Sequence, residues 1–101
     1  MYRAINNLPG GKTDVSFPDI HNMVSLYFLT LRNCSLTGPI PDYIWRFTNL
    51  FYLDLSFNNL TGKIPPDLNQ SQPQFVFLRS NKLNGTVPGW LTSLSNSGSY
   101  V

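Results

Sequence analysis

One apolar pattern occurs three times along this chain of 101 residues, and it constrains the fold more than any other feature. Its clearest copy covers residues 50–68 and reads LxxLxLxxNxLTGxIPxxL, where x stands for any residue. A copy 24 positions earlier comprises Leu26, Leu29, Leu31, Cys34, Leu36, Thr37, Gly38, Ile40, Pro41 and Ile44. A copy 23 positions later comprises Val76, Leu78, Asn81, Leu83, Gly85, Val87, Pro88 and Leu91. So many coincident positions indicate a structural unit that is repeated along the chain.

The period of these copies predicts the fold class. Apolar patterns with a period of roughly 20–29 residues are typical of leucine-rich-repeat solenoids. Side chains alternate between the two faces of a strand, so the LxL portion places two leucines on one face. A single repeat cannot bury such a face, whereas stacked repeats bury it as one continuous core. We therefore expect an α/β solenoid with a short parallel sheet on its concave face and 3₁₀-helical or irregular segments on its convex side.

Further residue types recur at fixed places after each LxL. Asn58 and Asn81 should lie inside the turn, where an amide can satisfy backbone groups that no strand ladder reaches. Cys34 holds the same place in the first copy and is expected to be buried there. Bends with positive φ are expected at Gly38, Gly62 and Gly85. Short helical turns are expected to begin at Pro41, Pro65 and Pro88, because proline is tolerated at a helix start.

The repeats divide the chain into three parts. Residues 1–16 are expected to be irregular, with Ile5 and Leu8 as remains of a preceding strand. The repeat segment covers residues 17–96, with a partial repeat at 17–25 and full repeats at 26–49, 50–72 and 73–96. Pro73 takes the place of Leu50, so the third strand is expected to begin late, near Phe75. Residues 97–101 are expected to form a frayed tail.

Composition argues against several classes of function. The seven basic residues are scattered without a run or a helical stripe, so nucleic acid is not an expected partner. No stretch approaches about 18 consecutive apolar residues, so this segment is not expected to insert into a membrane. A single histidine, His21, a single cysteine and five dispersed aspartates give little basis for a nucleophile with an oriented base, or for a metal site. We therefore expect a binding protein without enzyme activity or a cofactor.

The concave face is the predicted binding site, because residues that flank the two leucines of each strand point away from the core. These residues are Phe28, Thr30, Arg32, Tyr52, Asp54, Ser56, Phe75, Phe77 and Arg79. In parallel register, Phe28, Tyr52 and Phe75 form an aromatic column with steps of about 5 Å. Exposed aromatic residues combined with arginine are typical of binding hot spots. The alternative is cross-strand packing that stabilises the sheet without any ligand.

Four sequons of the form Asn-x-Ser/Thr predict glycosylation if the chain enters the secretory pathway. They begin at Asn33, Asn59, Asn69 and Asn84. A chain rich in Asn, Ser and Thr also produces sequons by chance. The functional interpretation is favoured because Asn33, Asn59 and Asn84 all lie just beyond a strand, in the turn that leads to the LxG motif.

The amino-acid sequences of the repeat motifs resemble those of one plant family. LxGxIP is the hallmark of the plant-specific leucine-rich repeat. Four longer sequences point to a particular group of plant repeat proteins: LRNCSLTG at 31–38, PDY at 41–43, LDLSFN at 53–58 and NGTVPGW at 84–90. They resemble the extracellular repeats of plant receptor-like serine/threonine kinases, in particular the group that carries a malectin-like domain after the repeats. The resemblance covers about residues 17–91.

This resemblance implies a non-enzymatic recognition segment in the ectodomain of a receptor-like kinase that takes part in signal perception. The implied partner is an extracellular peptide, a glycan or a partner receptor, met at the extracellular face of the plasma membrane. The alternative is a stand-alone repeat protein secreted to the cell wall, such as an inhibitor of cell-wall-degrading enzymes. Because the sequence has no paired-cysteine caps, signal segment, membrane span or kinase signature, we expect a fragment or a truncated gene product.

Overall fold

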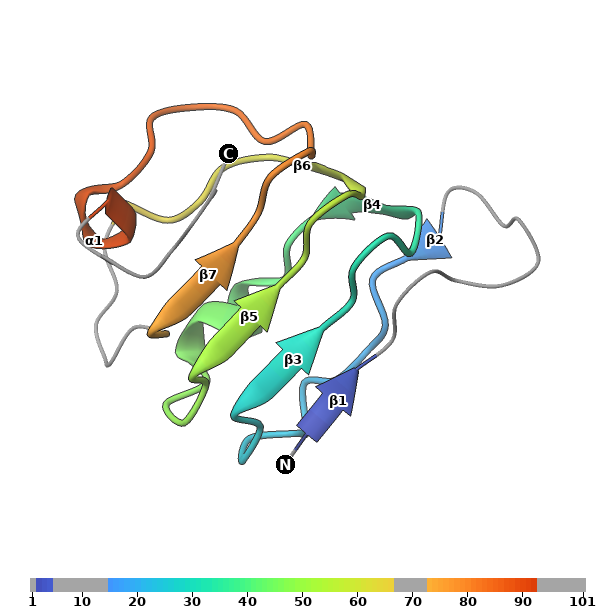
Figure 1. Cartoon of the computed structure of the whole chain (residues 1–101), viewed down its shortest axis with the longest axis vertical. Coiled ribbons are helices and arrows are strands. Elements are labelled where there is room, and N and C mark those ends of the chain that lie inside the picture. The colour runs from blue at the N-terminus through green and yellow to red at the C-terminus, as the bar shows by residue number, and fades with distance from the viewer. Residues whose placement is uncertain (1, 5–14, 67–72, 93–101) are drawn as a thin grey trace.

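The chain forms two parallel β-sheets joined by turns and short helical segments (Figure 1). The computed structural model describes residues 2–4, 15–66 and 73–92. The main sheet consists, in this order, of strands β1 (Tyr2–Ala4), β3 (Phe28–Thr30), β5 (Tyr52–Asp54) and β7 (Phe75–Phe77). The second sheet consists of β2 (Val15–Ser16), β4 (Leu36–Pro39) and β6 (Asn59–Thr61). Three turns of the solenoid each add one strand to each sheet, and the last turn adds β7 to the main sheet and an isolated bridge between Lys63 and Asn84 beside β6.

The register of the main sheet follows the sequence period. Tyr52 pairs with Phe28 on one side and with Phe75 on the other, so each repeat aligns with the next at the same position of the pattern. The third strand begins at Phe75, as predicted, but it is in register with β5. The expectation that Pro73 delays it is therefore wrong. Pro73 lies before the strand ladder, in which the backbone N–H groups of Gln74 and Phe75 donate to the Phe51 carbonyl, so its missing N–H costs the strand nothing.

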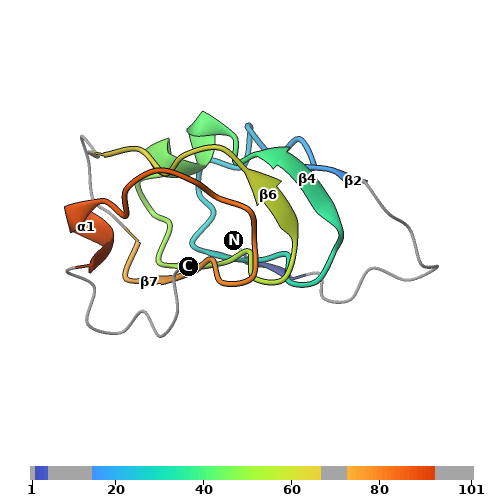
Figure 2. The ribbon, with the colours of Figure 1, turned by 90° about the horizontal axis from the view of Figure 1, so that it is seen from above.

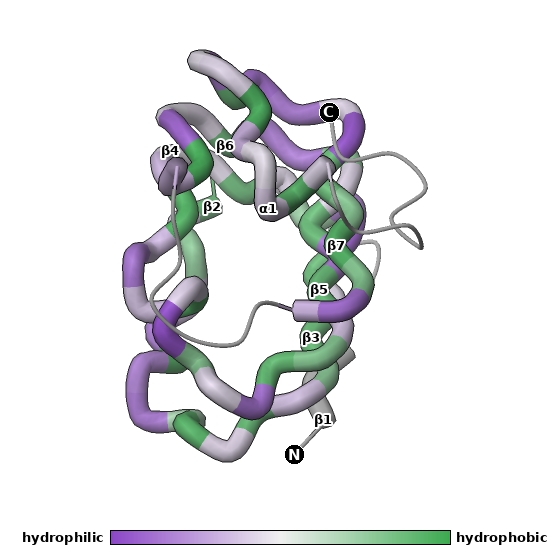
Figure 3. Tube along the Cα trace, turned by 90° about the vertical axis from the view of Figure 1, so that its left-hand side faces the viewer, coloured by the Kyte–Doolittle hydropathy of each residue, from purple (hydrophilic) through white to green (hydrophobic). Residues whose placement is uncertain are grey.

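The core consists of the inward-facing leucines of successive repeats. Leu29, Leu53 and Val76 are neighbours across the main sheet and are at most 1% exposed. Leucine and isoleucine side chains that follow the strands close this core from the other sides. In Figure 3 the turns of the chain enclose the interior, with β3, β5 and β7 along one wall and β4 and β6 along another. Burial of this continuous apolar surface is the main stabilising contribution that the repeats share.

The predicted asparagine column is confirmed. The Asn58 Oδ1 atom accepts hydrogen bonds from the backbone N–H groups of Cys34 and Leu36, at 2.9 and 3.1 Å. Its Nδ2 group donates to the backbone carbonyls of Leu31, Leu55 and Ser56. Asn81 repeats this arrangement one turn later, with the same kinds of backbone partners. Cys34 is buried at 3% exposure in the first copy of the column, as the sequence predicted.

The bends and helical turns also occupy their predicted places. Gly38, Gly62 and Gly85 have φ angles of 81°, 83° and 84°, in the left-handed region that glycine adopts without steric cost. Pro41 precedes the 3₁₀-helix η2 (Asp42–Arg46), which lies on the side opposite the main sheet (Figure 2). Pro88 precedes α1 (Gly89–Thr92), and Pro65 lies just before residues outside the described part. No helix among the described residues is long and apolar enough to cross a membrane.

Two expectations about the strands need correction. Residues 1–16 were expected to be irregular, yet β1 pairs in parallel with β3, and β2 pairs in parallel with β4. Strand pairing uses backbone groups, so β1 joins the sheet without the LxL pattern that marks the other repeats. The second sheet was not expected at all. Ile5, Leu8 and the tail at 97–101 lie outside the described residues.

Candidate functional site

The outer face of the main sheet, defined here as the side that points away from the core, carries an aromatic column. Phe28 and Tyr52 stack with their ring centroids 4.5 Å apart and their planes 7° from parallel. The ring of Phe75 follows at 5.9 Å from Tyr52, tilted by 36°. The parallel register of β3, β5 and β7 places these three side chains at equivalent positions, which is why they meet.

Further aromatic residues widen this column. Tyr27 and Phe51 directly precede β3 and β5 and are 48% and 49% exposed. The Phe51 ring contacts Phe75 edge-on at 5.3 Å, and Phe77 lies 5.5 Å from Tyr52. Sequence reasoning missed Tyr27 and Phe51, because it considered only residues that alternate with the core leucines. The signal that could have found them is the aromatic pair at the start of each of the first two strands.

A polar row follows the aromatic column along the strands. Asp54 is 6% exposed and accepts two hydrogen bonds at Oδ1, from the hydroxyl of Ser56 at 2.6 Å and from its backbone N–H at 3.0 Å. Thr30 and Ser56 are 7% and 2% exposed. These three side chains were expected to face outward, but neighbouring strands and their larger side chains cover them. They lie beneath the larger side chains of the outer face, and hydrogen bonds from Ser56 hold the Asp54 carboxylate in place.

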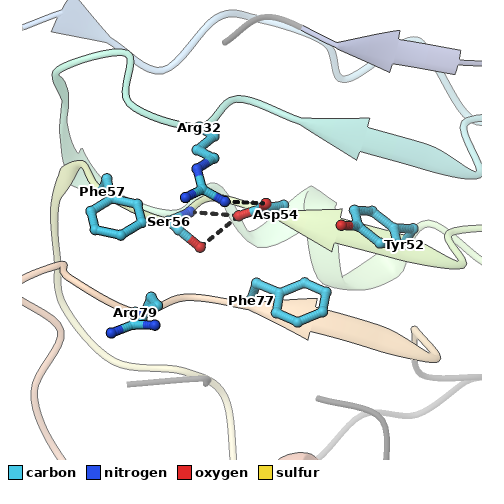
Figure 4. Close-up of a pocket in the computed structure, with 7 residues that line it drawn as sticks. All are labelled: Arg32, Tyr52, Asp54, Ser56, Phe57, Phe77 and Arg79. Carbon is cyan, nitrogen blue, oxygen red and sulfur yellow. Dashed lines mark hydrogen bonds and ion pairs between the residues drawn. The ribbon is translucent and has the colours of Figure 1, made fainter. Parts of the chain in front are cut away.

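At Asp54 and Ser56 of the polar row, the outer face has a hollow of about 300 Å³ (Figure 4). It is lined by Arg32, Tyr52, Asp54, Ser56, Phe57, Phe77 and Arg79. In Figure 4 the side chains of Arg32 and Arg79 lie on opposite sides of Ser56, and Phe57 lies at one end. Three neighbouring repeats contribute to it, so the hollow exists only when the repeats are stacked.

Two guanidinium groups in the hollow lie against the same aromatic ring. The Cζ atoms of Arg32 and Arg79 are 4.8 and 5.8 Å from the centroid of Phe57, within the range of cation–π attraction. Arg32 Nη1 lies 4.0 Å from Asp54 Oδ2, the outer limit of an ion pair. With two cations and one carboxylate, the lining carries a net positive charge.

Six of the nine predicted concave-face residues line this hollow, and the other three do not. The three outside it are Phe28, Thr30 and Phe75, which lie on the same outer face. Phe57 is the lining residue that sequence reasoning missed. Its φ of 60° turns the chain after the strand, and Asn33 and Ser80 adopt similar angles at the equivalent positions of the other repeats. An aromatic residue at a turn position that is polar in the neighbouring repeats is the signal that could have found it.

The sequon asparagines lie apart from the core. Asn33, Asn59 and Asn84 are exposed, and Asn69 lies outside the described residues. Asn59 belongs to β6 of the second sheet, whereas Asn33 follows Arg32 near the hollow. The residues that would carry a glycan are therefore exposed at these three sequons.

The residues that line the hollow determine which chemistry it could support. In the part of the chain that the structure describes, no group of three His, Cys, Asp or Glu side chains could hold a metal ion. The Ser56 hydroxyl donates to Asp54, and no histidine lines the hollow. What the lining presents to solvent is aromatic surface and guanidinium donors, which suit non-covalent recognition.

A comparison with protein families agrees with the repeat architecture. The family model described as Leucine Rich Repeat matches residues 25–47 and 49–71. These matches coincide closely with the first two full repeats expected from the sequence. The described residues are accordingly a repeat segment, and no kinase domain is among the matches.

Curated relatives come from Arabidopsis thaliana. A probable LRR receptor-like serine/threonine-protein kinase is 43% identical over 77 residues, covering 74% of this chain and 7% of the relative. Receptor-like protein 32 is 42% identical over 66 residues, covering 63% of this chain and 8% of its own length. The LRR receptor-like serine/threonine-protein kinase GSO2 is 44% identical over 70 residues, covering 67% and 6%. The chain thus spans less than a tenth of each of these relatives, and the matched part is the repeats. By its repeats and its relatives, the chain belongs to the plant leucine-rich-repeat proteins.

Proposed function

We propose that this chain is a ligand-recognition segment in the ectodomain of a plant receptor-like serine/threonine kinase, and that it contributes to signal perception without catalysing a reaction. The observation that carries the proposal is the hollow on the outer face, where exposed aromatic rings and two arginines meet. The partner is an extracellular peptide or protein, met at the extracellular face of the plasma membrane.

The exposure of the aromatic residues favours binding over sheet packing. Cross-strand stacking accounts for Phe28 and Tyr52, which contact each other across β3 and β5. It does not account for Tyr27, Phe51 and Phe57, which remain 38–49% exposed. A large apolar side chain that stays in water forgoes a substantial part of roughly 1.5–3 kcal/mol of burial. A partner that covers these rings would recover that free energy.

The relatives support the receptor part of the proposal. Two of the three described above are LRR receptor-like serine/threonine-protein kinases by name, and the third is a receptor-like protein. The matched residues lie in the repeats of this chain, so similarity concerns recognition surfaces and not catalysis. The three exposed sequons are consistent with a location outside the cell.

A peptide-display library tests the proposal directly. Random peptides are selected on the immobilised chain, and the enriched peptides are then measured against two single variants, Phe57→Ala and Val24→Ala. Phe57 lines the hollow, whereas Val24 is 65% exposed and lies before β3, outside the hollow. We expect enriched peptides to lose affinity for Phe57→Ala and to bind Val24→Ala normally. No enrichment, or equal loss with both variants, would contradict recognition at this face.

A further inference from the structure

We infer that the hollow binds an acidic side chain of an extended peptide. This inference rests on the proposed function and specifies the chemistry of the ligand. It assigns Arg32 and Arg79 as the carboxylate-binding residues and Phe57 as the residue that positions them. The competing ligand class is a glycan, and the structure gives separate reasons against it.

The arginines of the hollow have unused capacity for a carboxylate. Within the described residues, no carboxylate lies within ion-pair distance of Arg79. Arg32 reaches Asp54 only at 4.0 Å, and its side chain is 52% exposed. The Asp54 carboxylate already accepts two hydrogen bonds from Ser56 at its other oxygen. Each guanidinium carries five N–H donors in a planar fork that matches a carboxylate, so an incoming acid finds donors on both sides.

Phe57 holds these two cations near each other before a ligand arrives. Both Cζ atoms are within 6 Å of its ring centroid, where the negative face of the ring attracts cations. The left-handed backbone at Phe57 brings this ring to the end of the hollow. Two like charges repel, so a shared aromatic partner and the nearby Asp54 carboxylate lower the cost of their proximity. A carboxylate between them would remove the repulsion and add hydrogen bonds to charged groups.

The Tyr52 ring is poorly placed for a sugar. A sugar ring binds aromatic side chains by laying its C–H face on an open ring face. Phe28 covers one face of Tyr52 in a nearly parallel stack, and Phe75 and Phe77 lie tilted against the same ring at 5.9 and 5.5 Å. Aromatic edges carry partial positive charge. Such edges suit the carbonyl and carboxylate oxygens of a peptide.

The size of the hollow also fits a side chain. Its volume of about 300 Å³ lies at the lower end of small-molecule pockets, which span roughly 300–1,000 Å³. Tyr52 of the aromatic column lies at the end of the hollow opposite Phe57, beside Phe77 (Figure 4). A peptide can therefore place one acidic side chain in the hollow while its neighbouring residues lie over the column.

Isothermal titration calorimetry on the 101-residue chain tests the inference with three probes. The first is a hexapeptide of alternating glutamate and alanine, blocked at both ends so that only side-chain carboxylates are present. The second is its glutamine counterpart, and the third is a neutral galactose oligomer, which carries no carboxylate. We expect the glutamate peptide to bind about tenfold more tightly than the glutamine peptide, as charge-assisted hydrogen bonds imply. We expect no binding of the neutral galactose oligomer.

Two arginine variants provide the matched comparison. Arg79→Gln removes a cation from the hollow, whereas Arg46→Gln removes an exposed cation from η2 on the opposite side of the molecule. Arg79→Gln should abolish the preference for glutamate, and Arg46→Gln should preserve it. Phe57→Ala should weaken the preference without removing either charge, and the glutamate preference should fall as salt concentration rises.

Three results would overturn the inference. These are a glutamate peptide that fails to bind, equal binding of the two peptides, or tight binding of the neutral galactose oligomer. A preference that survives Arg79→Gln together with Arg32→Gln would also overturn it. If library-selected peptides depend on Phe57 but are indifferent to both arginine variants, recognition at the outer face stands and only the acidic specificity fails.

Discussion

The side-chain oxygen of Asn58 accepts a hydrogen bond from the backbone N–H of Cys34, 24 residues earlier in the chain, at 2.9 Å. The same oxygen accepts the N–H of Leu36, and the amide nitrogen donates to the carbonyl of Leu31. One buried side chain thus satisfies three backbone groups of the preceding repeat. The stability of the solenoid should therefore depend on this amide more than on its volume.

Replacement of Asn58 by leucine keeps the bulk and removes the amide. Each buried backbone group left without a partner should cost roughly 1–3 kcal/mol of unfolding free energy. Urea denaturation of Asn58→Leu measures the loss, and Asn59→Leu is the control, because Asn59 is the next residue and is exposed. The control should change stability by about 0.5 kcal/mol or less. Equal stability of the two variants would contradict the role of the column.

A substitution at Gly38 tests the effect of backbone strain without that of steric overlap. Its φ is +81°, and a Cβ atom placed on it would meet nothing within 4 Å. Gly38→Ala should therefore lower the free energy of unfolding by about 1–2 kcal/mol through the left-handed conformation alone. Gly89→Ala is the matched control, since Gly89 has equally open surroundings and no positive φ. Chemical denaturation that finds the two variants alike would show that the bend does not require glycine.

The Cys34 thiol should resist modification in the folded chain. It is 3% exposed and lies 3.3 Å from the Arg32 carbonyl, to which it donates a weak hydrogen bond. A bulky thiol reagent should react slowly in native buffer and rapidly in denaturant, because reaction requires opening of the repeat. Mass spectrometry over time measures both rates. Comparable rates in the two conditions would place the thiol on the surface.

The pKa of the Asp19 carboxyl should depend on His21. A hydrogen bond from the His21 ring, and a second from the His21 backbone N–H, hold the pKa of the Asp19 carboxyl below its ordinary 3.8. A lowered pKa in the folded state contributes stability above the unfolded value, and this contribution is lost as the pH falls through the folded value. His21→Gln should raise the pKa of Asp19 toward 3.8, as followed by NMR titration. Asn22→Gln, on the adjacent exposed residue, should leave it unchanged.

Exposure of the sequons predicts glycosylation in a secretory host. Asn33, Asn59 and Asn84 each precede a serine or threonine at the second position and are exposed. Secretion from plant cells should add mass that a glycosidase removes, and Asn→Gln at each position should remove one increment. Peptide mapping identifies the sites. Secreted protein without any glycan would contradict the prediction.

The residues that face the core made strands β3, β5 and β7 of the main sheet predictable. The LxL spacing identifies Leu29, Leu53 and their equivalents as inward-facing, and the 24-residue offset between Phe28 and Tyr52 fixes the strand register. The second sheet lacks such a signal. In β6 only Leu60 is buried, between exposed Asn59 and Thr61, and pairing with β4 uses backbone groups. A strand of three residues with one core side chain has too short a pattern to be distinguished from a turn.

The aromatic column of the candidate site was predictable for the same reason, since register alone brings Phe28, Tyr52 and Phe75 together. The hollow was only partly predictable. Phe57 reaches it through a left-handed φ that alternation along a strand does not anticipate. The burial of Asp54 depends on the size of side chains on neighbouring strands, and this is a property of the assembled sheet.

The hydrogen bonds that Asn58 and Asn81 make to the preceding repeat do not depend on the side chains there. Their partners are backbone N–H and carbonyl groups, which every non-proline residue offers. These hydrogen bonds can thus be kept when one repeat is exchanged for another of the same length with the same core residues. Residues on the outer face are then free to diversify while the scaffold stays constant. Exchange of repeats during evolution could therefore change which ligand such an array recognises. An engineer could assemble new specificities by joining whole repeats.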